Sequence, residues 1–505
     1  MKGLTLFGRS LISILGGVLL GLAFPPFGWF FLAPLGIAVL TAAWWRAPIG
    51  HALLAGYFGG LAFNGILLLW IRVLGWDAWI VLVAVWSLWW LLLAAGSAAA
   101  TWWQWWPVGI AGIWVLVEAV RGRFPFGGFP WGRVAFSQPD TTFTPWASIT
   151  GSAGVTALVA LVGALLLLVA RLVTERRWLP VGGVAVLAAL ITVSGAAITL
   201  PAAGQGAAPT VQLAVIQGSV PRTGLDAMAQ QRAVLNNHVT QTLTLAAQVA
   251  AGQAPQPAAV IWPENSSDVD PYIDLDARAS IDAAAAAIKA PILVGAVIAA
   301  GNDPNRLWNV GIVWEPGTGP TDMYIKRHPV PFGEYVPARS ILTAVISRFD
   351  RVPKDFVGGD EAGVLQLGPA RIGDVICFEI AYDAVVRDAT IGGAQMLVVQ
   401  TNNATYAGTG QPEQQLAISR LRAVEHGRSV VVAATSGISA AVAPDGLMLG
   451  QLPEMLPGSL SVVVPQREQL TIADQVGWLP EIALAMLGVL WWAMGVVSRR
   501  TGTNV

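Results

Sequence analysis

The sequence predicts a polytopic α-helical membrane part with about eight transmembrane helices and a soluble α/β domain inserted before the last helix. The 505 residues are 55% hydrophobic and only 12% charged, about half of the roughly 25% that is typical of soluble domains. Residues 1–200 hold only 14 charged residues but 17 of the 23 Trp. After residue 210, short apolar runs alternate with amphipathic helical patterns, which is typical of an α/β fold.

Composition also excludes several classes of protein. A net charge of -1 argues against a basic nucleic-acid binder, and the high hydrophobicity argues against disorder. The single cysteine, Cys377, excludes an intramolecular disulfide and a multi-cysteine metal site. His51, His238, His328 and His426 are isolated from one another in the sequence, so we expect no metal and no other cofactor.

Eight apolar runs approach the length of about 20 residues that a membrane-spanning helix needs. They cover 9–24, 27–45, 52–71, 78–99, 107–120, 150–170, 179–200 and 478–497. We therefore expect residues 1–200 to form a transmembrane domain of seven spans, and 478–497 to form a final transmembrane helix. The first run has features of a signal peptide, but the six runs that follow it favour an uncleaved span.

The loop charges predict the orientation of these spans. With the N-terminus in the cytoplasm, the inner segments hold eight Lys and Arg residues and the short outer loops hold four. Because basic residues are retained on the cytoplasmic side, we expect both chain ends there and the soluble domain outside the cytoplasm.

The Ala/Gly/Pro-rich stretch 201–209 predicts a linker, and 210–470 predicts the extracytoplasmic domain. Short apolar runs predict strands that are buried on both faces; they cover 211–216, 259–262, 292–298, 308–314, 372–378, 396–400 and 430–434. Helical patterns cover 227–251, 276–290 and 413–427. A sheet layer covered by helices is the expected architecture.

Residues 332–358 form an unusual stretch between these elements. Apolar Ile341, Leu342, Val345 and Ile346 lie among prolines and charges. The length favours a functional loop or lid, and a short helix packed on the domain is the alternative.

Three strand ends carry residues that suit covalent chemistry. Cys377 ends one apolar run, while Glu264 and Lys326 follow two others. A lone cysteine outside the cytoplasm is either a buried spectator or a reactive thiol, and a lone Glu or Lys at a strand end is usually just solvated. Together they would provide a nucleophile, a base and a cation for acyl transfer through a thioester.

Short motifs around these residues resemble a known superfamily. Val-Ile-Trp-Pro-Glu264-Asn-Ser-Ser, Tyr-Ile-Lys326 and Ile-Cys377-Phe-Glu379 look like the Glu–Lys–Cys motifs of the nitrilase superfamily. The segment Pro-Phe-Gly-Glu334-Tyr-Val-Pro, fused to several spans and one final span, is similar to the apolipoprotein N-acyltransferase family. Glu118, Arg121 and the Gly-Phe-Pro-Trp131 motif also resemble that family's loop after the fifth span.

The resemblance implies a nitrilase-like α-β-β-α sandwich for 210–470. It implies Glu264 as the general base, Lys326 as the oxyanion stabiliser and Cys377 as the nucleophile. Glu334 and Glu379 match further acidic positions near the site. Asn402, Tyr406, Arg121 and Trp131 are the expected substrate-binding residues.

The resemblance also implies the reaction and the location. Cys377 would take an acyl chain from a membrane phospholipid and pass it to the α-amino group of the N-terminal diacylglyceryl-cysteine of an apolipoprotein. The protein would be a multi-pass protein of a bacterial inner membrane. Three departures leave its substrate preference open: Phe378 replaces a Tyr, Thr405 replaces a Trp, and 221–225 lack the family's Lys-Trp pair.

Three alternative functions remain open at this point. A membrane-anchored nitrilase-type amidohydrolase would share the Glu–Lys–Cys residues but transfer the acyl group to water. A transporter with an extracytoplasmic domain would need ionisable residues inside its spans, where Glu118 is the main example. The third alternative is a membrane scaffold, a function in which the Glu–Lys–Cys residues would have no role.

Overall fold

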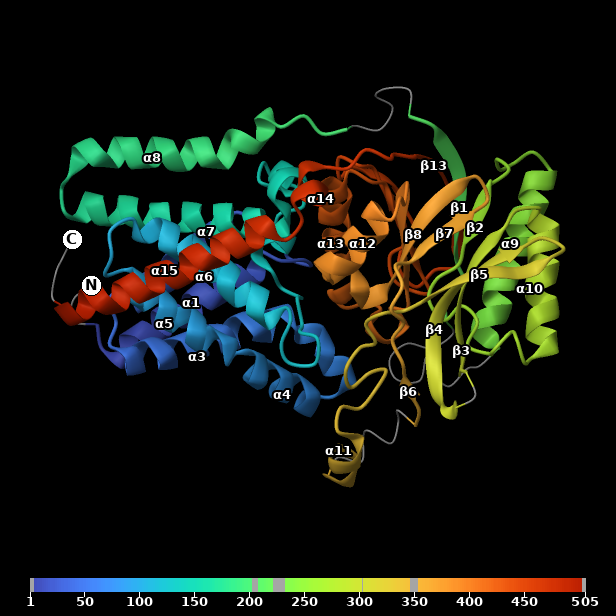
Figure 1. Ribbon diagram of the computed structural model, residues 1–505, viewed down its shortest axis with the longest axis horizontal. Helices are drawn as coiled ribbons and strands as arrows, with labels where there is room; N and C mark the ends of the chain where they lie inside the picture. The colour runs from blue at the N-terminus through green and yellow to red at the C-terminus, as the bar shows by residue number, and fades with distance from the viewer. Residues whose placement is uncertain (1–3, 202–207, 221–231, 302, 346–352, 502–505) are drawn as a thin grey trace. The chain divides into compact units, whose positions relative to one another are not determined.

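The computed structural model describes residues 4–201, 208–220, 232–301, 303–345 and 353–501. The chain divides into two compact units (Figure 1), each described below by itself. Unit 1 combines Met1–Thr199 with Thr471–Val505, and unit 2 is Leu200–Leu470. Most of the expected linker and the segment 221–225 lie outside the described residues.

All the regular secondary structure in the described residues of unit 1 is helical. Each of the eight expected spans overlaps a helix. Its helices are α1 (Leu6–Leu22), α2 (Leu32–Trp44), α3 (Ile49–Leu67), α4 (Trp76–Trp86), α5 (Trp89–Ala100), α6 (Trp106–Arg121), α7 (Ala147–Thr174), α8 (Trp178–Val193), α14 (Ile472–Val476) and α15 (Leu479–Thr501). The expected span 78–99 consists of two helices, α4 and α5, with a break at Ser87 and Leu88.

Four helical stretches in the described residues are long and apolar enough to cross a membrane: Trp76–Ala100, Thr144–Thr174, Trp178–Ala197 and Leu479–Thr501. The expectation of a helical membrane part is therefore confirmed, whereas the count of eight spans stays a prediction. The difference arises largely from length, because α1 has 17 residues and α2 has 13, fewer than the ~20 that a full span needs.

Glycines allow the helices of unit 1 to approach one another closely. A β-carbon at Gly17 of α1 would lie 2.2 Å from the Gly59 carbonyl oxygen of α3, and one at Gly112 of α6 would lie 2.5 Å from the Gly488 nitrogen of α15. Small residues at such crossings bring backbones into contact, which is how helices associate within membranes.

Unit 2 contains two β-sheets. The first has the order β13-β1-β2-β3-β4-β5, with β6 paired to β4, and the second has the order β12-β11-β10-β9-β8-β7. The strands are β1 (Thr210–Gln217), β2 (Ala259–Ile261), β3 (Ile292–Ala300), β4 (Asp303–Glu315), β5 (Gly319–Ile325), β6 (Asp355–Phe356), β7 (Val364–Leu367), β8 (Ala370–Ile376), β9 (Met396–Thr401), β10 (Val430–Ala434), β11 (Ala440–Val442), β12 (Met448–Gln451) and β13 (Gly458–Pro465).

Helices cover the outer faces of both sheets. In Figure 1, α9 (Ala233–Ala250) and α10 (Leu275–Ile288) lie on one side of the sheets, and α12 (Asp383–Ile391) and α13 (Gln411–His426) lie on the other. One apolar core fills the space between the sheets, with Leu213, Val313, Ile372 and Val398 fully or almost fully buried. The result is an α-β-β-α sandwich, as the sequence predicts.

The two ends of unit 2 lie on neighbouring strands. β1 pairs antiparallel with β13 over eight residues, from Thr210 opposite Pro465 to Gln217 opposite Gly458. The first and last strands of the unit are therefore adjacent at one edge of the first sheet.

The stretch 332–358 contains a short helix, α11 (Arg339–Val345), followed by β6. Ile341 on α11 has 66% of its surface exposed, and Ile346 lies outside the described residues. The stretch thus includes a short helix. The packing of that helix on the domain and the action of the stretch as a lid stay predictions.

Candidate active site

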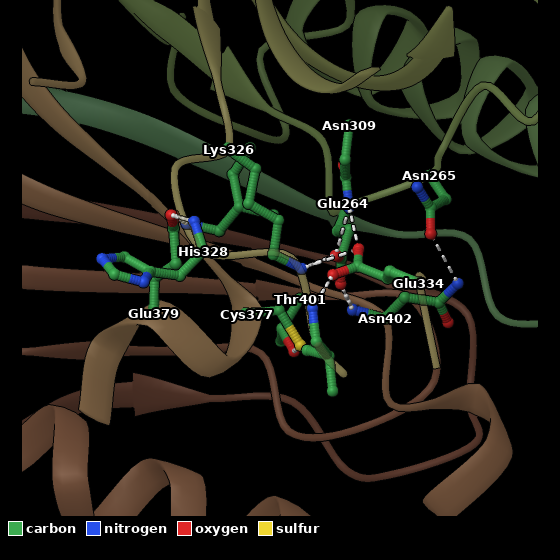
Figure 2. A network of polar contacts seen from close by, with 12 residues as sticks. Glu264, Asn265, Asn309, Lys326, His328, Glu334, Cys377, Glu379, Thr401 and Asn402 are labelled. Carbon is green, nitrogen blue, oxygen red and sulfur yellow. Dashed lines mark hydrogen bonds and ion pairs between the residues drawn. The ribbon is translucent and has the colours of Figure 1, made fainter. Parts of the chain in front are cut away.

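The three residues singled out at strand ends lie close together in unit 2. Glu264 follows β2, Lys326 follows β5 directly, and Cys377 follows β8 directly. β2 and β5 belong to the first sheet and β8 to the second. Figure 2 shows the three side chains pointing toward one region, where both sheets contribute to a single site.

The backbone at Cys377 has an unusual conformation at the start of a turn. Cys377 has a φ of +58° and is the first residue of the 3-10 turn Cys377–Ala381. A left-handed conformation is rare for residues other than glycine and is often found at active sites. Glu379 holds this turn in place, because its Oε2 accepts a hydrogen bond of 2.8 Å from the Ile376 backbone N–H.

Lys326 lies between two carboxylates. Its Nζ donates to Glu264 Oε1 at 3.0 Å and to Glu334 Oε1 at 2.9 Å. The lysine is 1% exposed. Burial alone would lower the lysine pKa, but the charges of Glu264 and Glu334 outweigh it and raise that pKa well above its ordinary value. Lys326 is therefore a fixed cation.

Asn309 on β4 joins the same two carboxylates. Its Nδ2 donates to Glu264 Oε1 at 2.7 Å and to Glu334 Oε1 at 2.8 Å. Asn309 is 2% exposed, so it holds both acids from a buried position. Sequence reasoning missed it, because an Asn within a predicted strand gives no local signal of a functional role.

Glu379 is a buried carboxylate that ties together the chain segments on either side of the site. Its Oε1 accepts from the backbone N–H groups of Arg327 at 2.7 Å and His328 at 3.0 Å, and from the Tyr324 hydroxyl at 3.0 Å. Burial raises the pKa of Glu379, opposed by the charge of Lys326 and by these N–H donors. Its contacts position the segment that follows Lys326 beside the turn of Cys377.

The thiol of Cys377 is poorly ionised in this resting state. Burial, followed by the negative charge of Glu264, raises the pKa of Cys377 to about 12, and the positive charge of Lys326 and a hydrogen bond from Thr401 oppose that rise. A thiol with a raised pKa reacts only when a base removes its proton. The carboxylate of Glu264 acts on this thiol through its charge and suits that role.

Asn402 and Tyr406 both lie near the thiol, on the segment that follows β9. The Asn402 backbone N–H donates to Glu264 Oε2 at 2.8 Å, which fixes the second oxygen of that carboxylate. Burial and the charge of a Cys377 thiolate raise the pKa of Tyr406, so Tyr406 stays a neutral phenol beside the sulfur.

Arg121 and Trp131 belong to unit 1 and are buried there. The guanidinium of Arg121 donates to the Trp131 carbonyl oxygen at 2.8 Å, and the two side chains are 7% and 1% exposed. Glu118, also buried, accepts from the Val134 N–H and the Thr156 hydroxyl. A structural role within unit 1 explains these contacts, and substrate binding by Arg121 and Trp131 stays a prediction.

The described residues include no group of three or more His, Cys, Asp or Glu side chains that is arranged to hold a metal ion. The reactive groups that the site brings together are a thiol, carboxylates and an ammonium. A thiol on a strained turn, next to a carboxylate and a buried ammonium in an α-β-β-α sandwich, defines unit 2 as a nitrilase-like domain.

Comparisons with known proteins agree with this class and narrow it. Residues 16–165 match the family model of the apolipoprotein N-acyltransferase N-terminal domain. Residues 225–470 match the carbon-nitrogen hydrolase family model. An amidase structure from Nesterenkonia sp. is 20% identical, covers 52% of this chain and 95% of its own, and has a TM-score of 0.37.

Two relatives extend the similarity over nearly the whole chain. Apolipoprotein N-acyltransferase of Mycolicibacterium smegmatis is 40% identical, covering 94% of this chain and 83% of the relative. The protein of the same name from Methylococcus capsulatus is 28% identical over 86% of each chain. The chain belongs to the apolipoprotein N-acyltransferase family. This membership makes it an acyltransferase and sets aside the transporter and scaffold alternatives.

Proposed function

We propose that this acyltransferase moves a fatty acyl chain from a membrane phospholipid to the α-amino group of the N-terminal diacylglyceryl-cysteine of an apolipoprotein, by way of a thioester on Cys377. The observation that carries the proposal is the convergence of Glu264, Lys326 and Cys377, within a chain of this family. Membership of the family makes lipoproteins the acceptor class, and we propose a membrane phospholipid as the acyl donor.

In the first step, Glu264 accepts the proton of the Cys377 thiol as the sulfur attacks the ester carbonyl carbon of the phospholipid. The ammonium of Lys326 stabilises the negative charge that develops on the carbonyl oxygen. Collapse of the tetrahedral intermediate breaks the ester C–O bond. The leaving alkoxide takes the proton from Glu264 and departs as a lysophospholipid, and the acyl group stays on sulfur.

In the second step, the lipoprotein α-amine attacks the thioester carbonyl. Glu264 accepts a proton from the attacking nitrogen, Lys326 again stabilises the oxyanion, and the C–S bond breaks. The proton returns from Glu264 to the sulfur, and the product is an amide. Glu334 and Asn309 hold the side chains of Glu264 and Lys326 in position through both steps. Glu379 holds the turn of Cys377.

Asn402 and Tyr406 complete the proposed substrate site. Asn402 fixes the Glu264 carboxylate through its backbone N–H. The Tyr406 ring lies near the sulfur, where the acyl carbonyl arrives. We also propose that Arg121 and Trp131 contact lipid, on the resemblance of their motif to the family's loop.

The location of the chemistry follows from the loop charges and the nature of the substrates. We propose seven spans in 1–200, the linker 201–209, an extracytoplasmic catalytic domain at 210–470 and a final span at 478–497. Both chain ends would then lie in the cytoplasm, and the enzyme would reside in a bacterial inner membrane. Two substrates anchored in the bilayer favour a site next to it, where water competes poorly for the thioester.

The intact mass of the purified protein tests the reaction directly. The wild type and Cys377→Ala are each incubated in lipid with a defined phospholipid. We expect the wild type to gain the mass of one acyl group and the variant to gain none. Addition of a diacylated lipopeptide should remove that mass and yield an N-acylated peptide.

The membrane-anchored amidohydrolase predicts a different outcome. It would form no adduct with phospholipid but would release ammonia from small amides. That pair of results would overturn the acyltransferase proposal. An adduct that the lipopeptide does not discharge would overturn the proposed acceptor alone.

A further inference from the structure

Three arginines from separate parts of unit 1 contact Trp45, two at its indole ring and one at its backbone. The Cζ of Arg171, on α7, lies 3.8 Å from the ring centroid of Trp45, and the Cζ of Arg46 lies 5.8 Å from the same ring. Arg9, on α1, donates through Nη1 to the Trp45 carbonyl oxygen at 3.2 Å and to that of Ala43 at 2.6 Å. We call Arg9, Arg46, Arg171 and Trp45 the Trp45 cluster.

Positive charge exceeds negative charge in the Trp45 cluster. Arg171 pairs with Glu175 at 3.0 Å. The hydrogen bonds found for Arg46 go to Thr101, from the backbone N–H at 3.0 Å and from Nε at 3.1 Å, so no carboxylate among the described residues pairs with it. Arg9 is 4% exposed, and its Nε has no partner among those residues. Like charges held together repel more strongly where water is scarce, so an added anion would stabilise the cluster.

The surroundings of the cluster are those of a membrane interface. Arg46 also lies over the ring of Trp102, with its Cζ 4.7 Å from the centroid. Trp105, in the same connection, is 71% exposed, and Trp residues are enriched where lipid headgroups lie. The Ser498 hydroxyl donates to the Trp102 carbonyl at 3.2 Å, which brings the end of α15 to the same place. Figure 1 shows that end of α15 and the turn between α7 and α8 at one end of unit 1.

Another group of arginines in unit 1 provides a contrast. Arg123 forms an ion pair with Glu481 at 2.5 Å, and Arg133 lies 3.9 Å from the same carboxylate. Arg121 donates to the Trp131 carbonyl. Arg123 and Arg133 thus share the carboxylate of Glu481. Arg46, by contrast, has no carboxylate partner among the described residues, and both Arg46 and Arg171 are half-exposed and lie over indole rings.

We propose that the Trp45 cluster binds the phosphate of an anionic phospholipid headgroup. A guanidinium group can form two parallel hydrogen bonds to phosphate oxygens. Stacking on Trp45 and Trp102 fixes the planes of the Arg171 and Arg46 guanidinium groups that would form these bonds. Basic pockets between membrane helices are known sites for anionic headgroups. The cluster belongs to unit 1, and Glu264, Lys326 and Cys377 belong to unit 2. In this proposal the lipid is bound and not consumed.

Native mass spectrometry of the full chain tests the site. The Cys377→Ala background prevents acyl transfer, so a retained lipid reports binding alone. The proteins are titrated in detergent with phosphatidylglycerol or with phosphatidylcholine, and a separate arm uses inorganic phosphate. The test variant is Arg46→Gln/Arg171→Gln. The matched control, Arg176→Gln/Arg177→Gln, removes two exposed arginines just after α7.

We expect the parent to retain phosphatidylglycerol in preference to phosphatidylcholine. The test variant should bind phosphatidylglycerol about tenfold or more weakly, because each basic residue beside anionic lipid contributes roughly a fivefold change. The control should stay within about twofold of the parent, since its arginines lie outside the cluster.

Equal losses in the test and control variants would overturn the proposal in favour of diffuse charge attraction. Saturation of the site by inorganic phosphate, at concentrations that block the lipid, would overturn the assignment to a headgroup. If the test variant fails to fold, Arg46→Lys/Arg171→Lys keeps both charges but loses the planar groups. Weaker lipid binding by that variant supports the site, and binding equal to the parent overturns it.

Discussion

The side-chain hydroxyl oxygen of Thr401 lies 3.3 Å from the sulfur of Cys377. The same hydroxyl lies 3.1 Å from Gln415 Oε1, and it has one proton to donate. Gln415 Oε1 already accepts from Asn403 Nδ2 at 2.8 Å. Thr401 is therefore free to turn its proton toward the sulfur when the thiolate forms, at little cost to the hydrogen bonding of Gln415.

Thr401→Val should make Cys377 less reactive toward an alkylating agent. Loss of a hydrogen bond to a charged group costs about 1.5–3 kcal/mol, so the thiol pKa rises and less thiolate is present. At any pH below that pKa, we expect alkylation by iodoacetamide to be slower by about tenfold or more. Thr401→Ser keeps the hydroxyl and should react at nearly the wild-type rate. Equal rates in Val and Ser variants would contradict a role for the hydroxyl.

Glu264→Gln should affect alkylation and acyl transfer in opposite directions. The charge of Glu264 is the second cause of the raised Cys377 pKa, after burial. Removing that charge lowers the thiol pKa, so alkylation at a fixed pH should become faster by roughly tenfold. Acyl transfer should fall by about 10²–10⁴-fold, because the general base is lost. The exposed Glu361→Gln is the control and should leave both rates unchanged. A parallel fall of both rates would indicate a collapsed site rather than a lost base.

Asp374→Asn should change how stability depends on pH. Asp374 is fully buried between the sheets, and neither of its carboxylate oxygens has a hydrogen-bond partner among the described residues. Burial, followed by the charge of Glu379, raises its pKa well above the ordinary value of 3.8. The folded state therefore favours the protonated acid, and wild-type stability is lost as pH rises from 3.8 toward the raised pKa.

The asparagine variant has no proton to lose at this position. We expect its unfolding temperature in detergent, followed by Trp fluorescence, to exceed that of the wild type by a margin that grows with pH above the ordinary aspartate pKa. Below that pKa the two proteins should differ little. A constant difference at all pH values would point to packing and not to ionisation as the cause.

Most strands whose residues are buried on both faces could be predicted from the sequence, whereas half-exposed strands could not. β3 and β10 are continuous apolar runs, and both were expected. β5 reads Gly-Pro-Thr-Asp-Met-Tyr-Ile with three consecutive exposed residues, and β13 alternates burial at its end. Such segments lack a continuous apolar signal, because they acquire their pairing from tertiary context.

The main residues of the candidate site could be predicted because they stand at strand ends. Lys326 and Cys377 come directly after β5 and β8, and Glu264 comes shortly after β2; side chains of neighbouring strands gather at such ends. Asn309 and Thr401 lie within strands, so only the packing of one sheet on the other shows that they face the site. Pairing between residues 138 positions apart, such as Asn402 with Glu264, has no local signature in the chain.

The adjacency of β1 and β13 has a consequence for how such a chain can arise. A domain whose first and last strands are neighbours can be inserted into a loop of another protein. The two ends of the interrupted loop can then stay close together. Here the helical unit comprises Met1–Thr199 and continues at Thr471, after unit 2. A soluble domain of this topology could thus be inserted between two membrane helices without any change in the order of its strands.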